Sequence, residues 1–319
     1  MNLLKPILFA SVLFSFTSSF AQFTDQINTN RPGTSMGAFS VGKKIIQAEG
    51  GIYGLLEDHK TLNYDARGFG MDLSARGGLF FEQLEFVLES QFQLDQYTAS
   101  GFQKNRSGFR QLTLGAKYLL YDPFKAKEEK PNIYSWKANH KFNWKQFIPA
   151  ISGYAGVNYA MKNDYSIPNE SVVSPKIMLI AQNHFNSGLV LVTNLVADKI
   201  GSDGFNYGYV LTLTKGLSDK WTGFIENKGI KSDYYSDGIF TLGATYLLKS
   251  NMQIDASISK NIKNTPELLF GGFGFSWRFD KKHKPVEIKN GKEVKESDGL
   301  KTEKKKRIDD IETIPLNPK

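Results

Sequence analysis

The sequence predicts an all-β protein, namely an antiparallel up-and-down transmembrane β-barrel of about 12 strands followed by a disordered C-terminal tail. Three features predict this class: an N-terminal export signal, stretches of alternating apolar and polar residues, and connections whose lengths alternate along the chain. A soluble two-sheet β-protein would share the alternation of residues. A soluble protein of that kind has no reason for its loop lengths to alternate, so the barrel is favoured.

The first residues have the features of a secretory signal. Lys5 precedes an apolar run at 7–16, and small residues lead to Ala21, after which we expect cleavage. An uncleaved anchor is the alternative, but the apolar run is too short to span a bilayer. The chain has no cysteine, and therefore no thiol for a lipid anchor and no disulfide. We expect an exported protein of the bacterial outer membrane.

Residues 84–95, LEFVLESQFQLD, show the alternation of polarity. Leu84 and Phe86 fall on one face of an extended chain, and Glu85 and Glu89 fall on the other. In hydrocarbon every backbone N–H and C=O group needs a partner in the protein, so a sheet is stable there only when it closes. Closure predicts apolar residues that face lipid and polar residues that face an enclosed lumen.

The same pattern repeats along the chain and gives twelve strands. Because this number is even, both ends of the sheet lie on the same side. The predicted strands are residues 43–56, 67–79, 84–95, 109–121, 147–161, 174–185, 188–199, 206–216, 220–230, 237–248, 252–262 and 268–279.

The connections between the predicted strands differ in length. Short ones follow the second, sixth, eighth and tenth strands, and longer polar ones, such as 97–108 and 162–173, follow the first, third and fifth. This predicts tight periplasmic turns and longer external loops. The connection 122–146 is an exception, which we interpret as a periplasmic excursion with a short helix near 134–141.

Composition changes abruptly after residue 279. Residues 280–319 contain 12 Lys or Arg and 9 Asp or Glu but no aromatic residue, which predicts a disordered periplasmic tail. The tail contributes +3 to the formal net charge of +8. The balance that remains for the barrel is too small to predict a nucleic-acid-binding surface.

The last predicted strand, 268–279, resembles the assembly signal of outer-membrane barrels. Aromatic residues alternate along one of its faces, and it ends in Phe279. The resemblance implies that the barrel-assembly machinery is a partner. In this chain 40 further residues follow Phe279, whereas the signal usually ends the chain.

The N-terminal part of the mature chain resembles a known family. The stretches INTNRPGTS at 27–35 and VGKKIIQAEGG at 41–51 are similar to the opening of the outer-membrane barrel family labelled "putative meta-pathway of phenol degradation". Its members start with Thr-Asp/Asn-Arg-Pro and continue into a strand of the type fQlEaGy; Asn30 stands where Asp is more frequent. The resemblance covers 27–279 and implies passage of aromatic or other hydrophobic compounds across the outer membrane.

These observations predict four consecutive segments. They are a signal peptide at 1–21, a periplasmic lead-in at 22–41, the barrel at 42–279 and the tail at 280–319. The lead-in contains the motif Asn30, Arg31 and Pro32, in which Pro32 and Gly33 form a turn. Arg31 either meets an inward acid such as Glu49 at the periplasmic mouth or anchors the lead-in to the barrel rim, and the second interpretation is favoured.

Charged residues at inward positions are the candidate functional residues of the lumen. Twelve strands enclose more room than the eight that side chains fill and less than the aqueous channel of a porin. The charges therefore line either a narrow polar conduit or a salt-bridge network that closes it. The candidates are Glu49, Asp72, Arg76, Glu85, Glu89, Asp95, Lys117, Lys176, Glu226, Lys228, Asp255 and Arg278.

Glycines also occupy inward positions. Gly115, Gly243, Gly272 and Gly274 either ease the curvature of the sheet or leave space for a ligand, and curvature is favoured.

The sequence predicts no enzyme, metal site or cofactor. The histidines are His59, His140, His184 and His283, and none has the local context of a Ser-His-carboxylate set. Two functional classes remain open. The first is a channel or transporter for small, apolar or aromatic solutes; the second is a non-conducting structural or interaction barrel that binds partners through its loops or its Lys-rich tail. The expected partners are outer-membrane lipid, the assembly machinery and a small solute, without nucleic acid.

Overall fold

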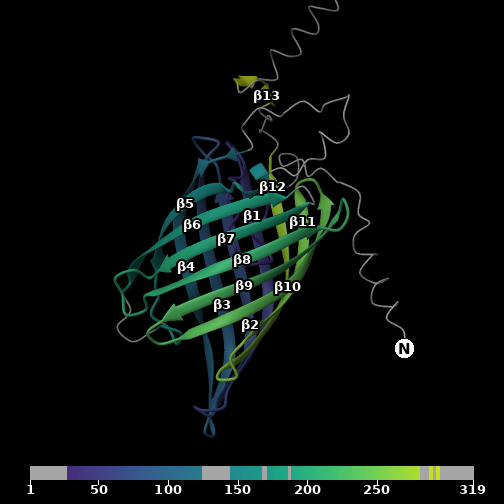
Figure 1. The fold of residues 1–319 in the computed structure, drawn as a ribbon. Coiled ribbons are helices and arrows are strands. Elements are labelled where there is room, and N and C mark those ends of the chain that lie inside the picture. Colours follow the sequence, from purple (N-terminus) through teal and green to yellow (C-terminus); the bar gives the residue numbers. More distant parts are fainter. Residues whose placement is uncertain are drawn as a thin grey trace, which may run out of the picture.

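The chain forms a closed barrel of twelve antiparallel strands (Figure 1). This computed structural model describes residues 27–123, 144–166, 171–185, 188–280, 287–289 and 292–294. Each strand pairs with its neighbours in sequence, and β1 pairs with β12 to close the sheet. The strands are β1 (Ile46–His59), β2 (Tyr64–Gly77), β3 (Leu84–Ala99), β4 (Phe102–Tyr121), β5 (Ala150–Tyr159), β6 (Val173–Phe185), β7 (Leu189–Asp198), β8 (Asn206–Gly216), β9 (Trp221–Ser232), β10 (Ser236–Lys249), β11 (Met252–Asn261) and β12 (Glu267–Phe279).

Both ends of the barrel sheet lie on one side, as the even strand number predicts. We call the rim with the start of β1 and the end of β12 the terminal rim, and the other the opposite rim. The predicted fold class is confirmed, and so is each of the twelve strands. Most predicted bounds lie within three residues of those in the structure, because the alternation of polarity is set directly by the pleat of the strand.

The hairpin of β3 and β4 is longer than predicted. Residues 97–108 were expected to be an external loop, but Tyr97 pairs with Lys104 and the strands meet at Ser100 and Gly101. These two residues have φ of 45° and 82°, as the two-residue turn of a tight hairpin requires. The hairpin extends beyond the opposite rim, at the lower end of Figure 1. The prediction of a loop was wrong because this polar sequence pairs with itself.

Apolar side chains cover the outside of the barrel. On β2, for example, Phe69 is 73 % exposed, whereas Arg76 on the inward face is 1 % exposed. Met71 and Leu73 share the outer face with Phe69. A continuous exposed apolar surface of this kind is characteristic of a surface that contacts a membrane. Lipid chains would cover these side chains and remove them from water. The polar residues that alternate with these positions point inward.

Short elements also lie outside the barrel strands. The helix expected near 134–141 lies outside the described residues, which include a short 3₁₀ helix, η2 (Trp144–Phe147), before β5. Within the predicted tail, β13 (Glu287–Lys289) and β14 (Lys292–Val294) pair as a small antiparallel hairpin. In the described part of the chain, no helix has the length and apolar character needed to cross a membrane.

Inward glycines make room for inward aromatic rings. Tyr154 on β5 lies flat against the wall, and a Cβ atom on Gly115 would be 2.3 Å from its hydroxyl oxygen. Gly243 accommodates Phe224 in the same way, and Gly272 lies against Tyr53. These contacts give the inward glycines a packing role as well as the predicted role in curvature.

The fit of Tyr154 against the wall predicts a specific cost for a small substitution. Gly115→Ala should destabilise the barrel by about 1–3 kcal/mol, because Tyr154 must leave its position. Gly153→Ala is the matched control on the outer face, where the nearest atom to a new Cβ is 3.7 Å away. Urea unfolding in lipid vesicles measures both. Equal stability of the two variants would contradict this packing.

Candidate functional site

The interior of the barrel near the terminal rim is occupied by residues 27–45, which we call the plug segment. Ile27, Met36, Ala38, Val41 and Ile45 are each less than 10 % exposed. The backbone of the segment forms hydrogen bonds with inward side chains of strands on several sides of the barrel. The described part of the predicted lead-in therefore lies within the lumen and not before the barrel.

Glu226 on β9 holds one end of a loop in the plug segment. Its carboxylate accepts hydrogen bonds from the Thr34 amide at 2.9 Å, from the Thr34 hydroxyl at 2.8 Å and from the Ser35 amide at 3.2 Å. Thr212 on β8 donates a further hydrogen bond to the same carboxylate at 2.8 Å. Because several donors converge on one buried anion, its desolvation is offset without a cation.

Neutral side chains hold the next residues of the plug segment. The Met36 amide donates to Asn194 Oδ1 at 2.6 Å, and Asn194 Nδ2 donates back to the Met36 carbonyl at 2.9 Å. The Ala38 amide donates to Gln182 at 2.8 Å, and the Ser152 hydroxyl donates to the Ala38 carbonyl at 2.6 Å. The wall thus supplies the partners that a neighbouring strand would supply in a sheet.

A fully buried charge cluster lies on β1 to β4 beside the plug segment. Arg76 Nε is 2.6 Å from Glu85 Oε1, and Arg76 Nη1 is 3.1 Å from Glu49 Oε1. Lys117 Nζ lies 3.5 Å from Glu85 and donates to the carbonyls of Gly37 and Phe39 at 2.8 and 2.9 Å. Removing one partner of such a cluster leaves an uncompensated charge and costs about 3–5 kcal/mol.

Arg31 of the predicted motif reaches further into the lumen than expected. The amides of Asn30 and Arg31 donate to Glu49 Oε2 at 3.2 and 3.3 Å, whereas the Arg31 guanidinium lies 3.3 Å from Asp255 and 3.6 Å from Asp72. The contact with Glu49 is thus made by the backbone of Arg31. The guanidinium lies against the inward glycines Gly51 and Gly274 and not at the rim.

The other predicted lumen residues form separate pairs. Lys176 Nζ lies 3.2 Å from Glu89, Arg106 Nε lies 2.7 Å from Asp95, and Arg278 lies 3.0 Å from Asp280. Lys228 is half-buried on the inward face of β9. The structure therefore brings the predicted charges together in local groups, of which the largest contacts the plug segment. Within the described residues, no group of His, Cys, Asp and Glu could hold a metal ion.

The lumen near the opposite rim is lined by rings and cations. Tyr165, in the connection between β5 and β6, donates to Asp95 at 2.9 Å, and the Arg106 guanidinium lies above the rings of Tyr97 and Tyr165 at 4.6 and 5.1 Å. Burial and the bond to Asp95 raise the pKa of Tyr165 to about 12, so its hydroxyl remains protonated at neutral pH. This connection is thereby fixed to the wall.

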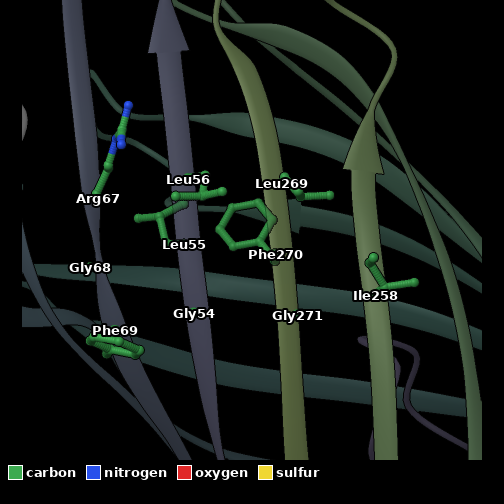
Figure 2. A pocket seen from close by; sticks show the side chains of 10 residues that line it. All are labelled: Gly54, Leu55, Leu56, Arg67, Gly68, Phe69, Ile258, Leu269, Phe270 and Gly271. Atoms are coloured by element: carbon green, nitrogen blue, oxygen red, sulfur yellow. The ribbon is translucent and has the colours of Figure 1, made fainter.

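A hollow of ≈ 430 Å³ lies on the other side of the wall (Figure 2). It is centred on Gly54 and Gly271, which face each other across β1 and β12 and leave the outer surface without side chains. Leu56, Phe69 and Leu269 surround it. Several of its lining residues, such as Leu56, Phe69 and Ile258, are exposed on the outer face, so the hollow lies on the apolar surface of the barrel.

Several residues that contact the plug segment were missed by the sequence analysis. Asn194, Gln182 and Ser152 are neutral, and the prediction considered charged residues only. Their inward parity and polarity were visible in the sequence. Arg110, which is discussed below, was missed for a different reason, because a bulge in β4 interrupts the alternation on which parity depends.

A closed sheet with an apolar outer surface and a charged interior defines an outer-membrane type β-barrel. The chain belongs to the family described as "Putative MetA-pathway of phenol degradation", whose model matches residues 29–279. The resemblance that the motif around Arg31 indicated is therefore confirmed. A search of curated proteins gives no match.

Solved structures that resemble this barrel share little sequence with it. The COG4313 outer membrane channel from Pseudomonas putida F1 is 11 % identical, with a TM-score of 0.51 over 80 % of this chain and 100 % of that one. The translocator domain of the autotransporter NalP from Neisseria meningitidis is 12 % identical, with a TM-score of 0.45 over 74 % and 88 % of the two chains. At these identities the likeness concerns the fold alone.

The role of Glu226 can be tested through access to the plug segment. The chain has no cysteine, so Met36→Cys introduces a single thiol at a side chain that is 2 % exposed. We expect this thiol to react slowly with a maleimide, and Glu226→Gln to accelerate the reaction about tenfold or more, because the charged acceptor of the neighbouring amides is lost.

Glu89→Gln is the control for this labelling experiment. It makes the same chemical change at an inward glutamate that pairs with Lys176 and not with the plug segment. It should leave the labelling rate of Met36→Cys nearly unchanged. Equal acceleration by both substitutions would mean that Glu226 is not a specific anchor.

Proposed function

We propose that the protein is a gated channel that passes small aromatic or other hydrophobic solutes across the bacterial outer membrane. The plug segment is the gate, and the terminal rim faces the periplasm. The family's description, which refers to phenol degradation, supports the solute class. The likeness to an outer membrane channel of the same fold supports the transport role.

The observation that carries this proposal is how the plug segment is attached. Its amides at Thr34, Ser35, Met36 and Ala38 bind wall side chains. The bonds to the neutral acceptors Asn194 and Gln182 contribute about 0.5–1.5 kcal/mol net each, and those to the Glu226 carboxylate about 1.5–3 kcal/mol, because water can replace the partner when the segment moves. Water in the lumen can therefore take over these bonds one by one, and displacement of the segment does not require the barrel wall to open.

A non-conducting structural barrel is the second candidate. The observation that favours it is the buried cluster of Arg76, Glu85, Glu49 and Lys117, which fixes the plug segment near the terminal rim. In that case the charges serve stability alone, and partners bind to the loops or to the Lys-rich tail. This candidate predicts that no substitution in the plug segment opens a path without unfolding the barrel.

The proposal includes the route by which the protein reaches the membrane. Residues 1–21 direct export, β12 carries the aromatic face that the assembly machinery recognises, and residues 280–319 form a periplasmic tail. The charged residues that line the lumen guide or exclude solutes. The proposal assigns transport and no catalysis to the barrel: His184, for example, packs edge-on against Phe39 of the plug segment.

Conductance in planar bilayers tests the gate. The wild-type protein should show brief, small openings, and Glu226→Gln should raise the fraction of time spent open about tenfold, because it weakens the attachment of the plug segment. A variant with Met36→Cys and Asn194→Cys can be bridged by a short, reducible bifunctional thiol reagent. The bridge should suppress openings until a reductant is added.

Ile225→Leu is the control, since it changes an exposed side chain on the outer face of β9 next to Glu226. Its conductance should equal that of the wild type. Silence of both the wild type and Glu226→Gln, with folded barrels, would contradict the gated channel and favour the structural barrel.

A further inference from the structure

An arginine is inserted into the wall of the lumen by a β-bulge. On β4 the pairing with β3 passes from Gln111 directly to Phe109, so Arg110 is an extra residue without a partner on the neighbouring strand. A bulge of this kind re-aims the side chain that it carries. Arg110 accordingly points into the lumen, where its Nη1 donates to Gln93 Oε1 at 3.0 Å.

Arg110 has no carboxylate partner in the described part of the chain. Its contacts are with the amide of Gln93 and the ring of Tyr165, whose centroid is 5.6 Å from the guanidinium carbon. Arg106 on the same strand differs, because Asp95 neutralises it at 2.7 Å. A guanidinium that is exposed to the lumen and bound only by neutral groups retains donors for an anion.

A cleft lies beside Arg110 near the opposite rim, where β4 and β5 are no longer paired. The pairing of β4 with β5 ends at Thr113 and Asn158, and above this point Asn163 donates to the Phe109 carbonyl at 2.7 Å. The cleft between them has a volume of ≈ 70 Å³. Its lining is mixed: it contains the charged residues Arg110, Lys199 and Asp198, the polar residues Gln111, Asn158, Asn163 and Ser166, and rings and apolar groups from Phe109, Leu112, Tyr159, Met161 and Tyr165.

The lining combines two cations, Arg110 and Lys199, with aromatic rings and polar side chains. Other charges nearby are already engaged: Asp198 accepts from Asn158 at 2.6 Å, and Asp164 pairs with Lys104 at 2.6 Å. A cavity of about 150 Å³ encloses a benzene molecule. The smaller cleft therefore takes a carboxylate and the edge of a ring, while the rest of the ring remains in the lumen beside Tyr165.

We propose that this cleft is a binding site for small monocyclic aromatic carboxylates, which Arg110 recognises through their anionic group. The inference rests on the proposed function, for which it names the solute class, but its test does not require conduction. The carboxylate accepts hydrogen bonds from the guanidinium in a bidentate arrangement. The ring packs against Tyr165, whose hydroxyl is held by Asp95.

Binding of benzoate to the purified full-length protein in detergent micelles tests the site. Titration calorimetry should detect binding to the wild type, weaker binding of acetate, which lacks the ring, and weaker binding of benzyl alcohol, which lacks the charge. Arg110→Gln should weaken benzoate binding about tenfold or more, since hydrogen bonds to a charged group are lost. Arg110→Lys should recover part of the affinity.

Arg67→Gln is the matched control. Arg67 lies on the outer face of β2, is 75 % exposed and is 3.7 Å from Asp65, so its removal takes the same charge from the barrel without touching the lumen. It should leave benzoate binding unchanged. Three results would overturn the proposal: no benzoate binding to the wild type, equal binding to Arg110→Gln, or equal binding of benzyl alcohol. Conductance without benzoate binding would support the channel and reject only the proposed benzoate site. Benzoate binding without conductance would support the site and reject the channel.

Discussion

The binding of a peptide segment by the inner wall of a closed sheet is the interaction on which the rest of this structure depends. The amides of Thr34, Ser35, Met36 and Ala38 are enclosed by a barrel whose outer surface is apolar, and inward side chains of the wall are their partners. This requirement for partners explains why glutamate, asparagine and glutamine occupy buried positions on β6, β7 and β9. The charge cluster around Arg76 meets the same requirement for the carbonyls of Gly37 and Phe39, through Lys117.

The two halves of the lumen therefore have different physical characters. Near the terminal rim the wall and the plug segment satisfy each other, and side chains such as Glu85 and Lys117 are fully buried. Near the opposite rim the lumen is lined by Tyr97, Tyr165 and two arginines, and Arg110 remains exposed. A solute would meet the aromatic and cationic half first and the plug segment second, which separates recognition from gating in the proposed channel.

The barrel could be predicted from the sequence because its outward residues are apolar and alternate with polar inward residues along each strand. Each strand alternates with the pleat, so twelve strands and their inward charges could be read residue by residue. The position of the plug segment could not be read in this way, since Thr34 binds Glu226 across 192 residues and has no periodic pattern. The β3–β4 hairpin was not predicted because the outer face of its tip is polar, unlike the outer face of the rest of the two strands. Arg110 was not predicted because the bulge shifts the parity by one residue.

The central claim is that the plug segment is held inside the barrel by bonds to its backbone. Amide hydrogen exchange in lipid nanodiscs, followed by mass spectrometry, measures these bonds directly. The account predicts that peptides covering residues 34–38 exchange orders of magnitude more slowly than an unstructured chain, at rates closer to those of the strands. Exchange of these amides at the rate of an unstructured peptide, with the strands still protected, would contradict the account.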